Sequence, residues 1–456
     1  NMTEDKIEQS LLDTLASLGW DIVNGPTIGP DGTMERGYDE VVLGRRLELA
    51  LARLNPDIPA ARRDEAQKRI IRTVSPDTLI DNRDFHTLLV EGVNVEYRHQ
   101  DGSIRTAQVR LFDFESHANN DFVAINQLTV VQDNVNRRPD VVLYVNGLPL
   151  VVVELKNATD SKADLHAAFN QIQTYKQQIS TLFRTNELCV ISDGLDARVG
   201  TLTAPFERFS AWKTIDGERE EGNVPELETL ARGIFTKDRL LDIIRNFVVF
   251  ERVGEDDASY IKKLAAYHQY WAVNKALVRT IDASRPEADH RAGVVWHTQG
   301  SGKSLSMMFY TGKLVADPKM GNPTIVVVTD RNDLDGQLFG TFSACSDLLR
   351  QTPVQAENRA HLRELLTRES GGIIFTTIQK FFPEDGGDTF PMLSERTNIV
   401  VMADEAHRSQ YGLKARVRET DAKLVYGNAK YMRDALPQAS YIGFTGTPIE
   451  KEDKST

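Results

Sequence analysis

Five short apolar runs in the second half of the chain constrain its fold more than any other feature. They are AGVVWHT (292–298), TIVVVTD (324–330), GGIIFTT (371–377), TNIVVMADEAH (397–407) and YIGFTGT (441–447). Each run is continuous and β-branched rather than alternating, which is typical of parallel strands covered on both faces. Helix-like segments separate several of the runs, so the sequence predicts a doubly wound α/β sheet. Polar residues follow each run, at the carboxyl ends of the strands, where such sheets bind ligands.

The first half of the chain has a different pattern, and we expect two domains. A length of 456 residues is too great for one compact domain. The stretch at 214–230 is polar, acidic and contains glycine, which is typical of a boundary. We therefore place the first domain at residues 1–228 and the second at residues 229–456.

The composition limits the classes of protein to which the chain can belong. Charged residues make up 26% of the chain and hydrophobic residues 41%, as in soluble globular proteins. No apolar run reaches the roughly 18 residues of a membrane helix, and the N-terminus has no signal-peptide pattern. Two cysteines fit a reducing cytoplasm and exclude a disulfide framework. The net charge of −12 argues against a uniformly basic nucleic-acid-binding surface, although local basic grooves remain compatible with it.

The segment that follows the first apolar run predicts a nucleotide-binding loop. It consists of Gln299, Gly300, Ser301, Gly302, Lys303 and Ser304. Its glycines let backbone N–H groups close around phosphate oxygens, and the next helix adds its positive end. Lys303 would reach the β- and γ-phosphates of ATP, and Ser304 would bind Mg²⁺. His297 stands where the usual P-loop has a glycine, so only the G-x-G-K-S core matches, and the alternative is a chance glycine-rich turn.

Acidic residues at the end of the fourth run supply the second half of an ATP site. Asp404 and Glu405 follow a buried run, so they emerge at the carboxyl end of a strand. Asp404 would hold Mg²⁺ through water, and Glu405 would orient or activate the attacking water. The alternative is a solvated acidic loop, which the G-x-G-K-S segment upstream disfavours.

These motifs resemble those of superfamily 2 helicases and translocases. QGSGKS, DEAH and GFTGTP resemble motifs I, II and III, and TDRNDLDGQL and FTTIQKF resemble DNA-contacting motifs of the restriction (R) subunit of type I restriction–modification enzymes. The resemblance implies a RecA-like lobe in which Gln269, within YHQYWAVNKA, reads the adenine edge. It also implies a coupling of nucleotide state to DNA by His407, Thr445, Gly446 and Thr447. From the residues alone, the threonines and the glutamine could equally be capping residues.

The stretch DVVLYVNGLPLVVVELK (140–156) in the first half is an apolar hairpin that carries charges at its ends. An Asn-Gly dipeptide joins its two strands, as in a two-residue turn. Such a turn would pair Asp140 with Val153, and a turn one residue longer would pair Asp140 with Glu154. Lys156 shares a face with Glu154, because side chains alternate along a strand. Either register therefore brings two carboxylates and an ammonium together.

Two close carboxylates repel each other unless a cation lies between them. A hard divalent cation, most plausibly Mg²⁺, bound by Asp140 and Glu154 would remove this repulsion. Such a cation, with Lys156 beside it, would activate water for attack on a phosphodiester. The pattern P-D…E-x-K resembles the PD-(D/E)xK nuclease fold, which implies that these three residues are catalytic. The alternative is a surface ion pair at the end of a strand.

Two further elements fit a nuclease of the type I R subunit. Gln171 and Tyr175 are one helical turn apart, and the family's nuclease domain has a Q-x-x-x-Y element beside its site. Glu8 lies within the apolar arc of the N-terminal helix, where a carboxylate needs a partner. The family fold has an N-terminal helical glutamate near the metal, and an ion-paired core edge is an equal alternative.

The resemblance covers nearly the whole chain and identifies it as a member of the type I R-subunit family. It implies ATP-dependent translocation on double-stranded DNA and Mg²⁺-dependent cleavage far from an unmethylated recognition site. The implied partners are methyltransferase (M) and specificity (S) subunits. The family's second motor lobe follows motif III, and this sequence ends at Thr456, so we expect the chain alone to hydrolyse ATP poorly and not to translocate.

Three alternatives remain open at this stage. The chain could be a superfamily 2 helicase or translocase with a non-catalytic N-terminal domain. It could be a scaffold that binds nucleotide and partner subunits without chemistry of its own. It could also be a type III restriction subunit, although the nuclease domain of that family is expected after the motor.

Overall fold

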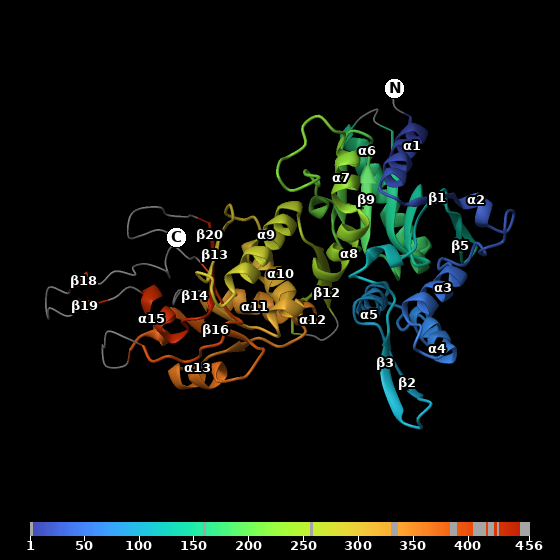
Figure 1. Cartoon of the computed structure of the whole chain (residues 1–456). Helices are drawn as coiled ribbons and strands as arrows, with labels where there is room; N and C mark the ends of the chain where they lie inside the picture. Colours follow the sequence, from blue (N-terminus) through green and yellow to red (C-terminus); the bar gives the residue numbers. More distant parts are fainter. Residues whose placement is uncertain are drawn as a thin grey trace. The chain divides into compact units, whose positions relative to one another are not determined.

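The computed structural model describes residues 3–157, 161–255, 259–329, 336–383, 390–404, 416–417, 424–425 and 428–446. The chain divides into two units (Figure 1). Unit 1 comprises residues 1–250 and 254–267, and unit 2 comprises residues 251–253 and 268–456. The division lies after the boundary that we expected at residue 228, because residues 229–250 and 254–267 pack within unit 1. The indole of Trp20, for example, donates to the backbone oxygen of Phe235 (2.9 Å).

Unit 1 is built on a mixed six-stranded sheet in the order β1-β4-β7-β8-β9-β10. These strands are β1 (Asp21–Asn24), β4 (Phe122–Asn126), β7 (Val141–Val145), β8 (Leu148–Leu155), β9 (Leu188–Ser192) and β10 (Ala197–Gly200). The β1–β4 and β8–β9 pairs are parallel, and the other pairs are antiparallel. Every residue of β7 and β8 is buried, which explains why these strands are continuously apolar.

The predicted hairpin is formed by β7 and β8. Its turn residues, Asn146 and Gly147, have φ values of 52° and 78°, as a two-residue turn of this kind requires. A bulge in β8 shifts the register by one residue, so that Val141 pairs with Val153. Asp140 therefore lies opposite Glu154, although the turn itself is the shorter of the two that we considered.

Helices and small hairpins complete unit 1. They are α1 (Glu4–Ser17), α2 (Gly25–Ile28), α3 (Gly44–Leu54), α4 (Ala60–Ile71), α5 (Thr78–Glu91), β2 (Val93–Arg98), β3 (Ile104–Val109), β5 (Val130–Gln132), β6 (Val135–Arg137), α6 (Ser161–Gln178), α7 (Glu226–Ile234), α8 (Lys237–Asn246), β11 (Val248–Arg252) and β12 (Tyr260–Leu264). The main core lies between the sheet and α6, which contributes Leu165, Ile172 and Tyr175. The α1 helix buries Ile7, Leu11 and Leu15 and contacts α7 and β1.

Unit 2 contains a parallel six-stranded sheet in the order β13-β20-β17-β14-β16-β15. Its strands are β13 (Arg291–Trp296), β14 (Thr324–Thr329), β15 (Val354–Gln355), β16 (Ile373–Thr377), β17 (Ile399–Asp404) and β20 (Ser440–Thr445). The predicted parallel sheet is thus confirmed, and the five apolar runs account for all of its strands except β15. A separate pair is formed by β18 (Arg416–Val417) and β19 (Leu424–Val425).

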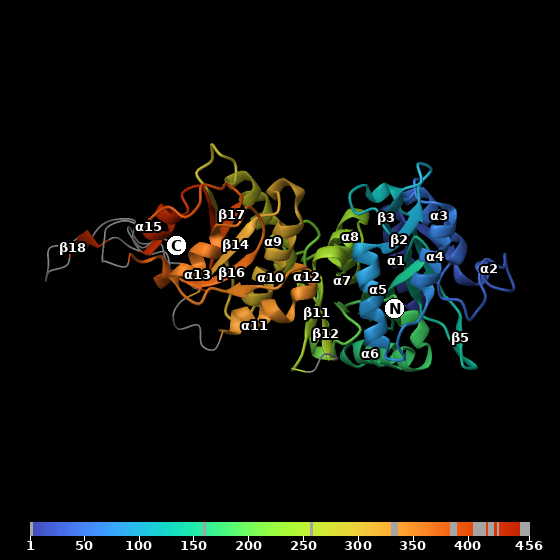
Figure 2. The same ribbon diagram turned by 90° about the horizontal axis from the view of Figure 1, so that it is seen from below.

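Helices cover both faces of this sheet. They are α9 (Tyr267–Ala283), α10 (Lys303–Ala316), α11 (Gln337–Ala344), α12 (Ser346–Leu349), α13 (Arg359–Leu366) and α15 (Asn428–Ala435). Residues of α13 and α15 join β14, β16 and β17 in one core cluster. On the other face, Tyr310 of α10 packs on Phe444 of β20, with ring centres 5.7 Å apart. Figure 2 shows β14 and β16 between α13 and α10. Among the described residues, every helix is too short or too polar to cross a membrane.

Candidate active sites

The end of the β7–β8 hairpin opposite its turn carries the predicted cluster of charges. Asp140 Oδ2 accepts a hydrogen bond from the backbone N–H of Leu155 (2.7 Å). Glu154 Oε1 accepts from Lys156 Nζ (2.6 Å), and Glu154 Oε2 accepts from the Tyr175 hydroxyl (3.0 Å). Both carboxylates are buried, with Asp140 9% and Glu154 2% exposed. The structure therefore brings Asp140, Glu154, Lys156 and Tyr175 into one place.

Burial and neighbouring negative charges make the two carboxylates unusually basic. Burial raises the pKa of Asp140 to about 6 and that of Glu154 to about 7, and the charge of Asp140 adds to the effect on Glu154. Burial lowers the pKa of the Lys156 ammonium, but the attraction of Glu154 and Asp140 outweighs this, so its pKa is raised. The site thus holds more negative charge than one lysine neutralises, which favours an added cation.

Glu8 of α1 contributes a further carboxylate beside this cluster. Its Oε1 accepts from the side-chain amide of Asn126 (2.7 Å), and its Oε2 accepts from that of Gln127 (2.6 Å). The charge of Glu8 is one of the causes that raise the pKa of Asp140. Glu8 thus bonds to neutral amides at the end of β4, which pairs with β7, and its place near a metal stays a prediction.

Some residues around the cluster were not predicted from the sequence. Glu4 lies one helical turn before Glu8, and its Oε1 is 3.7 Å from Lys156 Nζ. The four-residue spacing of these glutamates on α1 is the signal that could have indicated Glu4. Asn126 and Gln127 gave no local signal, because their contact with Glu8 depends on the docking of α1 against β4.

Gln171 lies beside Tyr175 on α6, as the Q-x-x-x-Y pattern predicted. Burial and the charge of Glu154 raise the pKa of the Tyr175 phenol. The side chain of Gln171 forms a hydrogen bond with Tyr175 that lowers this pKa, but by less than the other causes raise it. The phenol therefore stays protonated at neutral pH and remains a hydrogen-bond donor to Glu154. Gln171 acts on the cluster through Tyr175.

The donor atoms at this end of the hairpin fit a hard divalent cation. Two buried carboxylates with raised pKa values supply the oxygen ligands that Mg²⁺ prefers. Within the described part of the chain, no group of three or more His, Cys, Asp or Glu side chains is arranged to hold a metal ion. Asp140 and Glu154 would thus be the side-chain ligands, and Mg²⁺ commonly completes such a set with water.

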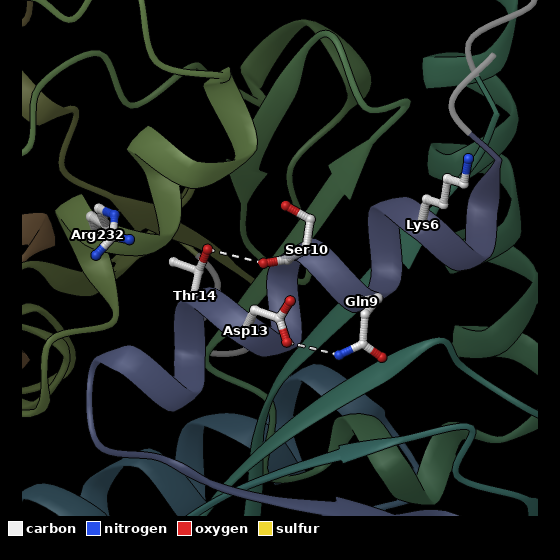
Figure 3. A pocket seen from close by; sticks show the side chains of 6 residues that line it. All are labelled: Lys6, Gln9, Ser10, Asp13, Thr14 and Arg232. Carbon is white, nitrogen blue, oxygen red and sulfur yellow. Dashed lines mark hydrogen bonds between the residues drawn. The ribbon is translucent and has the colours of Figure 1, made fainter.

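A separate pocket of about 370 Å³ lies beside α1 (Figure 3). It is lined by Lys6, Gln9, Ser10, Asp13, Thr14 and Arg232. Its polar groups are paired locally, since Gln9 donates to Asp13 (2.8 Å) and Arg232 donates to Glu228 (2.7 Å). At about 100° per residue, Lys6 and Ser10 point away from the side of α1 that carries Glu8. This pocket is not part of the carboxylate cluster.

The predicted nucleotide-binding loop lies between β13 and α10 in unit 2. Gly300 and Gly302 have φ values of 80° and 84°, which glycine adopts without strain. The side-chain amide of Gln269 donates to the backbone oxygen of Gly302 (3.0 Å), and a Cβ on Gly302 would lie 2.6 Å from that amide nitrogen. Gln269 therefore contacts the loop, and its role in reading the adenine edge stays a prediction.

The two halves of the predicted ATP site meet in the structure. Lys303 begins α10, and its Nζ forms a 2.7 Å ion pair with Oδ1 of Asp404, the last residue of β17. Ser304 follows on the first turn of α10. The sheet order explains the meeting, because β13 and β17 both flank β20 and their carboxyl ends lie at one edge.

His297 takes the place of the missing glycine at the start of the loop. Its Nδ1 lies 2.9 Å from the Ser301 hydroxyl oxygen, and the residue is 4% exposed. Burial lowers the pKa of His297 to about 4, and the nearby His268 and Lys303 contribute to this shift. The imidazole is therefore neutral at neutral pH and acts as a hydrogen-bonding partner of the loop.

The structure describes only some of the residues that the resemblance implies for coupling. Thr445 is fully buried at the end of β20, and its backbone oxygen accepts from the N–H of His297 (2.9 Å). Gly446 accepts from the Trp296 indole through its backbone oxygen (3.0 Å). Residues 443–446 of the predicted motif III thus lie beside β13, the strand that leads into the predicted nucleotide-binding loop. Glu405, His407 and Thr447 lie outside the described residues.

Comparison with known proteins gives matches for both units. Residues 1–208 match a family described as the type I restriction enzyme R protein N terminus, and residues 268–456 match the SWI2/SNF2 ATPase family. The type I restriction enzyme HindI endonuclease subunit of Haemophilus influenzae is 49% identical, over 100% of this chain and 43% of the relative. The MjaIXP protein of Methanocaldococcus jannaschii is 32% identical, over 99% of the chain and 43% of the relative. The chain thus spans less than half the length of these relatives.

Proposed function

The chain belongs to the type I restriction enzyme R protein family, and we propose that it carries the nuclease and an ATPase lobe of such an enzyme. In this proposal, unit 1 cleaves double-stranded DNA, and unit 2 is one lobe of the ATP-dependent motor that translocates it. The convergence of Asp140, Glu154 and Lys156 at one end of a buried hairpin is the observation that supports the nuclease. We assign this arrangement to the PD-(D/E)xK class of nucleases.

In the proposed cleavage site, Asp140 and Glu154 would hold Mg²⁺. The bound cation would polarise the phosphodiester and make water more acidic. Lys156 stays protonated because Glu154 and Asp140 attract its charge, so its ammonium can stabilise negative charge that develops on the phosphate. The Tyr175 hydroxyl fixes the orientation of the Glu154 carboxylate through the bond to Oε2. These side chains bind and orient, and no nucleophilic side chain is required.

In the proposed motor site, the backbone of the loop at residues 300–304 surrounds the phosphates of ATP. Lys303 would exchange its partner Asp404 for the β- and γ-phosphates, and Asp404 would hold Mg²⁺ together with Ser304. Gln269 would read the adenine edge from its place beside Gly302. We retain Glu405 as the residue that orients water, and His407, Thr445, Gly446 and Thr447 as coupling residues, on the resemblance to motifs II and III.

The proposed substrate and partners follow from the family. The Haemophilus influenzae relative is named an endonuclease subunit of a type I restriction enzyme. We propose that this chain likewise acts in the cytoplasm, in a complex with methyltransferase (M) and specificity (S) subunits. Those subunits would recognise the unmethylated target, and the R protein would translocate the duplex and cut it at a distance.

The proposed nuclease is tested by substitutions in the complex assembled with M and S subunits. Asp140→Ala, Glu154→Ala and Lys156→Ala are each expected to abolish Mg²⁺-dependent cleavage, measured as linearisation of a plasmid with one target. DNA-stimulated ATP hydrolysis should continue, because unit 2 is unchanged. Lys303→Ala serves as the reciprocal variant, since it should stop ATP hydrolysis. Cleavage at the normal rate by Lys156→Ala would overturn the assignment and favour a translocase with a non-catalytic N-terminal domain.

A further inference from the structure

We infer that Asn126 and Gln127 are positioning residues that fix Glu8 beside the Asp140–Glu154 pair and so strengthen cation binding there. This inference rests on the proposed nuclease function. Asn126 is the last residue of β4, and Gln127 follows it directly. Their amides bond to opposite oxygens of the Glu8 carboxylate, at 2.7 Å and 2.6 Å. With a donor on each oxygen, the plane of the carboxylate is fixed.

The two hydrogen bonds orient Glu8 and leave lone pairs on its oxygens that can accept further bonds. A carboxylate has about four lone-pair sites, and each amide takes one of them. Hydrogen bonds to an ionised acceptor are stronger than those between neutral groups. Amide donors carry no net charge, so they hold Glu8 in place without neutralising it. The carboxylate thus adds its negative charge at this end of the sheet, because Gln127, which bonds to it, also bonds to the backbone of Asp140.

The same short segment also holds the backbone at Asp140. The N–H of Gln127 donates to the backbone oxygen of Asp140 (2.8 Å), and Asn126 pairs with Val141 in the β4–β7 ladder. One segment therefore sets the position of two carboxylates, one through its side chains and the other through its backbone. A change in its conformation would move Glu8 relative to Asp140.

The backbone of this segment is held in an uncommon conformation. Gln127 has a φ of 53°, in the left-handed region that residues other than glycine seldom adopt. Such a conformation persists where the surrounding structure fixes it. Gly25 packs against the segment so closely that a Cβ there would lie 2.6 Å from the backbone oxygen of Gln127. Residues 126 and 127, with their backbone fixed in this way, thus contact both Glu8 of the N-terminal helix and Asp140 of the carboxylate pair.

The inference is tested by measuring cation binding directly, in the absence of DNA and nucleotide. The probe is Mn²⁺, whose free concentration is followed by electron paramagnetic resonance as it is titrated into the protein. Asn126→Ala and Gln127→Asn are each expected to weaken Mn²⁺ binding about 10-fold, an effect typical of groups that surround a metal site without being ligands. Asparagine tolerates a left-handed backbone, so Gln127→Asn keeps the fold while its shorter side chain no longer reaches Glu8.

A double-substitution cycle shows whether these amides act through Glu8. In a Glu8→Gln background, Gln127→Asn should weaken Mn²⁺ binding no further, because residues that act as a unit are not additive. Gln9→Ala is the matched control, since this exposed amide of α1 bonds to Asp13 on the other face of the helix. Its Mn²⁺ affinity should equal that of the unaltered protein.

Failure of this inference can be distinguished from failure of the proposed nuclease. Unchanged Mn²⁺ affinity in Asn126→Ala and Gln127→Asn, together with a clear loss in Asp140→Asn, would refute only the role of the amides. A further loss from Gln127→Asn in the Glu8→Gln background would also refute it, since the effect would not pass through Glu8. If Asp140→Asn itself alters neither Mn²⁺ binding nor cleavage, the nuclease proposal fails as well.

Discussion

Lys303 and Asp404 form a 2.7 Å ion pair that joins the nucleotide-binding loop to the end of β17. Replacing Lys303 with alanine removes the ammonium that would contact the phosphates in the proposed motor site. We therefore expect Lys303→Ala to weaken binding of a fluorescent ATP analogue at least 10-fold, a loss of about 1.4 kcal/mol or more. Fluorescence titration measures this affinity.

A matched control for this substitution lies nearby in unit 2. Lys319 is exposed in the short 3₁₀ helix at Pro318–Met320, after α10. Lys319→Ala changes the net charge by the same amount and should leave nucleotide affinity unaltered. An equal loss of affinity in both variants would mean that Lys303 acts through overall charge rather than by direct contact with phosphate.

The Tyr175–Glu154 hydrogen bond gives a second prediction, which depends on the proposed nuclease. Tyr175→Phe removes the donor 3.0 Å from Glu154 Oε2 and leaves the ring in the core. Because groups that orient metal ligands typically contribute 10–100-fold, we expect a loss of about 10-fold in Mg²⁺-dependent cleavage with unchanged ATP hydrolysis. The control is Tyr38→Phe, whose hydroxyl donates to Asp31 (2.8 Å) at an exposed position. Equal cleavage by Tyr175→Phe and the control would contradict this role.

The sequence predicted the parts of the fold that depend on local pattern. Continuous apolar runs are a property of strands covered on both faces, so the parallel sheet of unit 2 followed from them. The meeting of Lys303 and Asp404 then followed from the rule that ligands bind at the carboxyl ends of such strands. The Asn-Gly turn was also predictable, because this dipeptide readily adopts the left-handed backbone of the turn.

Features that depend on tertiary packing could not be predicted in this way. The bulge in β8, which places Asp140 opposite Glu154, leaves no distinct pattern in a run of Val and Leu. The contact of Glu8 with Asn126 joins segments more than a hundred residues apart. The polar stretch at 214–230 looked like a linker, yet Glu226 accepts a bond from the backbone N–H of Ala197 (2.9 Å) in β10. The polar composition of residues 214–230 therefore did not identify the boundary between the two units.

A buried ion network in unit 1 gives a third prediction, on stability. Lys262 Nζ lies 3.1 Å from Glu187 Oε2, and His86 Nδ1 lies 3.0 Å from the same carboxylate. Lys262 and Glu187 are both almost wholly buried. Lys262→Met should destabilise unit 1 by about 3–5 kcal/mol, because it leaves Glu187 charged and buried with less compensation. Lys262→Met combined with Glu187→Gln should cost less, as measured by urea unfolding.

The same network predicts a dependence on pH. Burial tends to raise the pKa of Glu187, but the charges of His86 and Lys262 outweigh it, so its pKa is lowered from 4.5. A carboxyl with a lowered folded-state pKa contributes stability fully above its unfolded value, and this is lost as pH falls through the folded value. The difference in unfolding free energy between the unaltered protein and Glu187→Gln should be constant from pH 7 to 5 and shrink below about 4.5. A difference that does not change with pH would contradict the ionised state of Glu187.

The last prediction concerns His297 in the nucleotide-binding loop. Its pKa is lowered to about 4, whereas an unfolded histidine titrates near its ordinary value of 6.5. Between these values the unfolded chain binds a proton that the folded chain does not, so stability rises with pH across this window. Lowering the pH from 7.5 to 5.5 should therefore destabilise the unaltered unit 2 by about 1 kcal/mol more than His297→Gln, which cannot titrate. Urea unfolding at the two pH values measures this difference. Equal losses in the two proteins would show that the folded loop does not lower the pKa of His297.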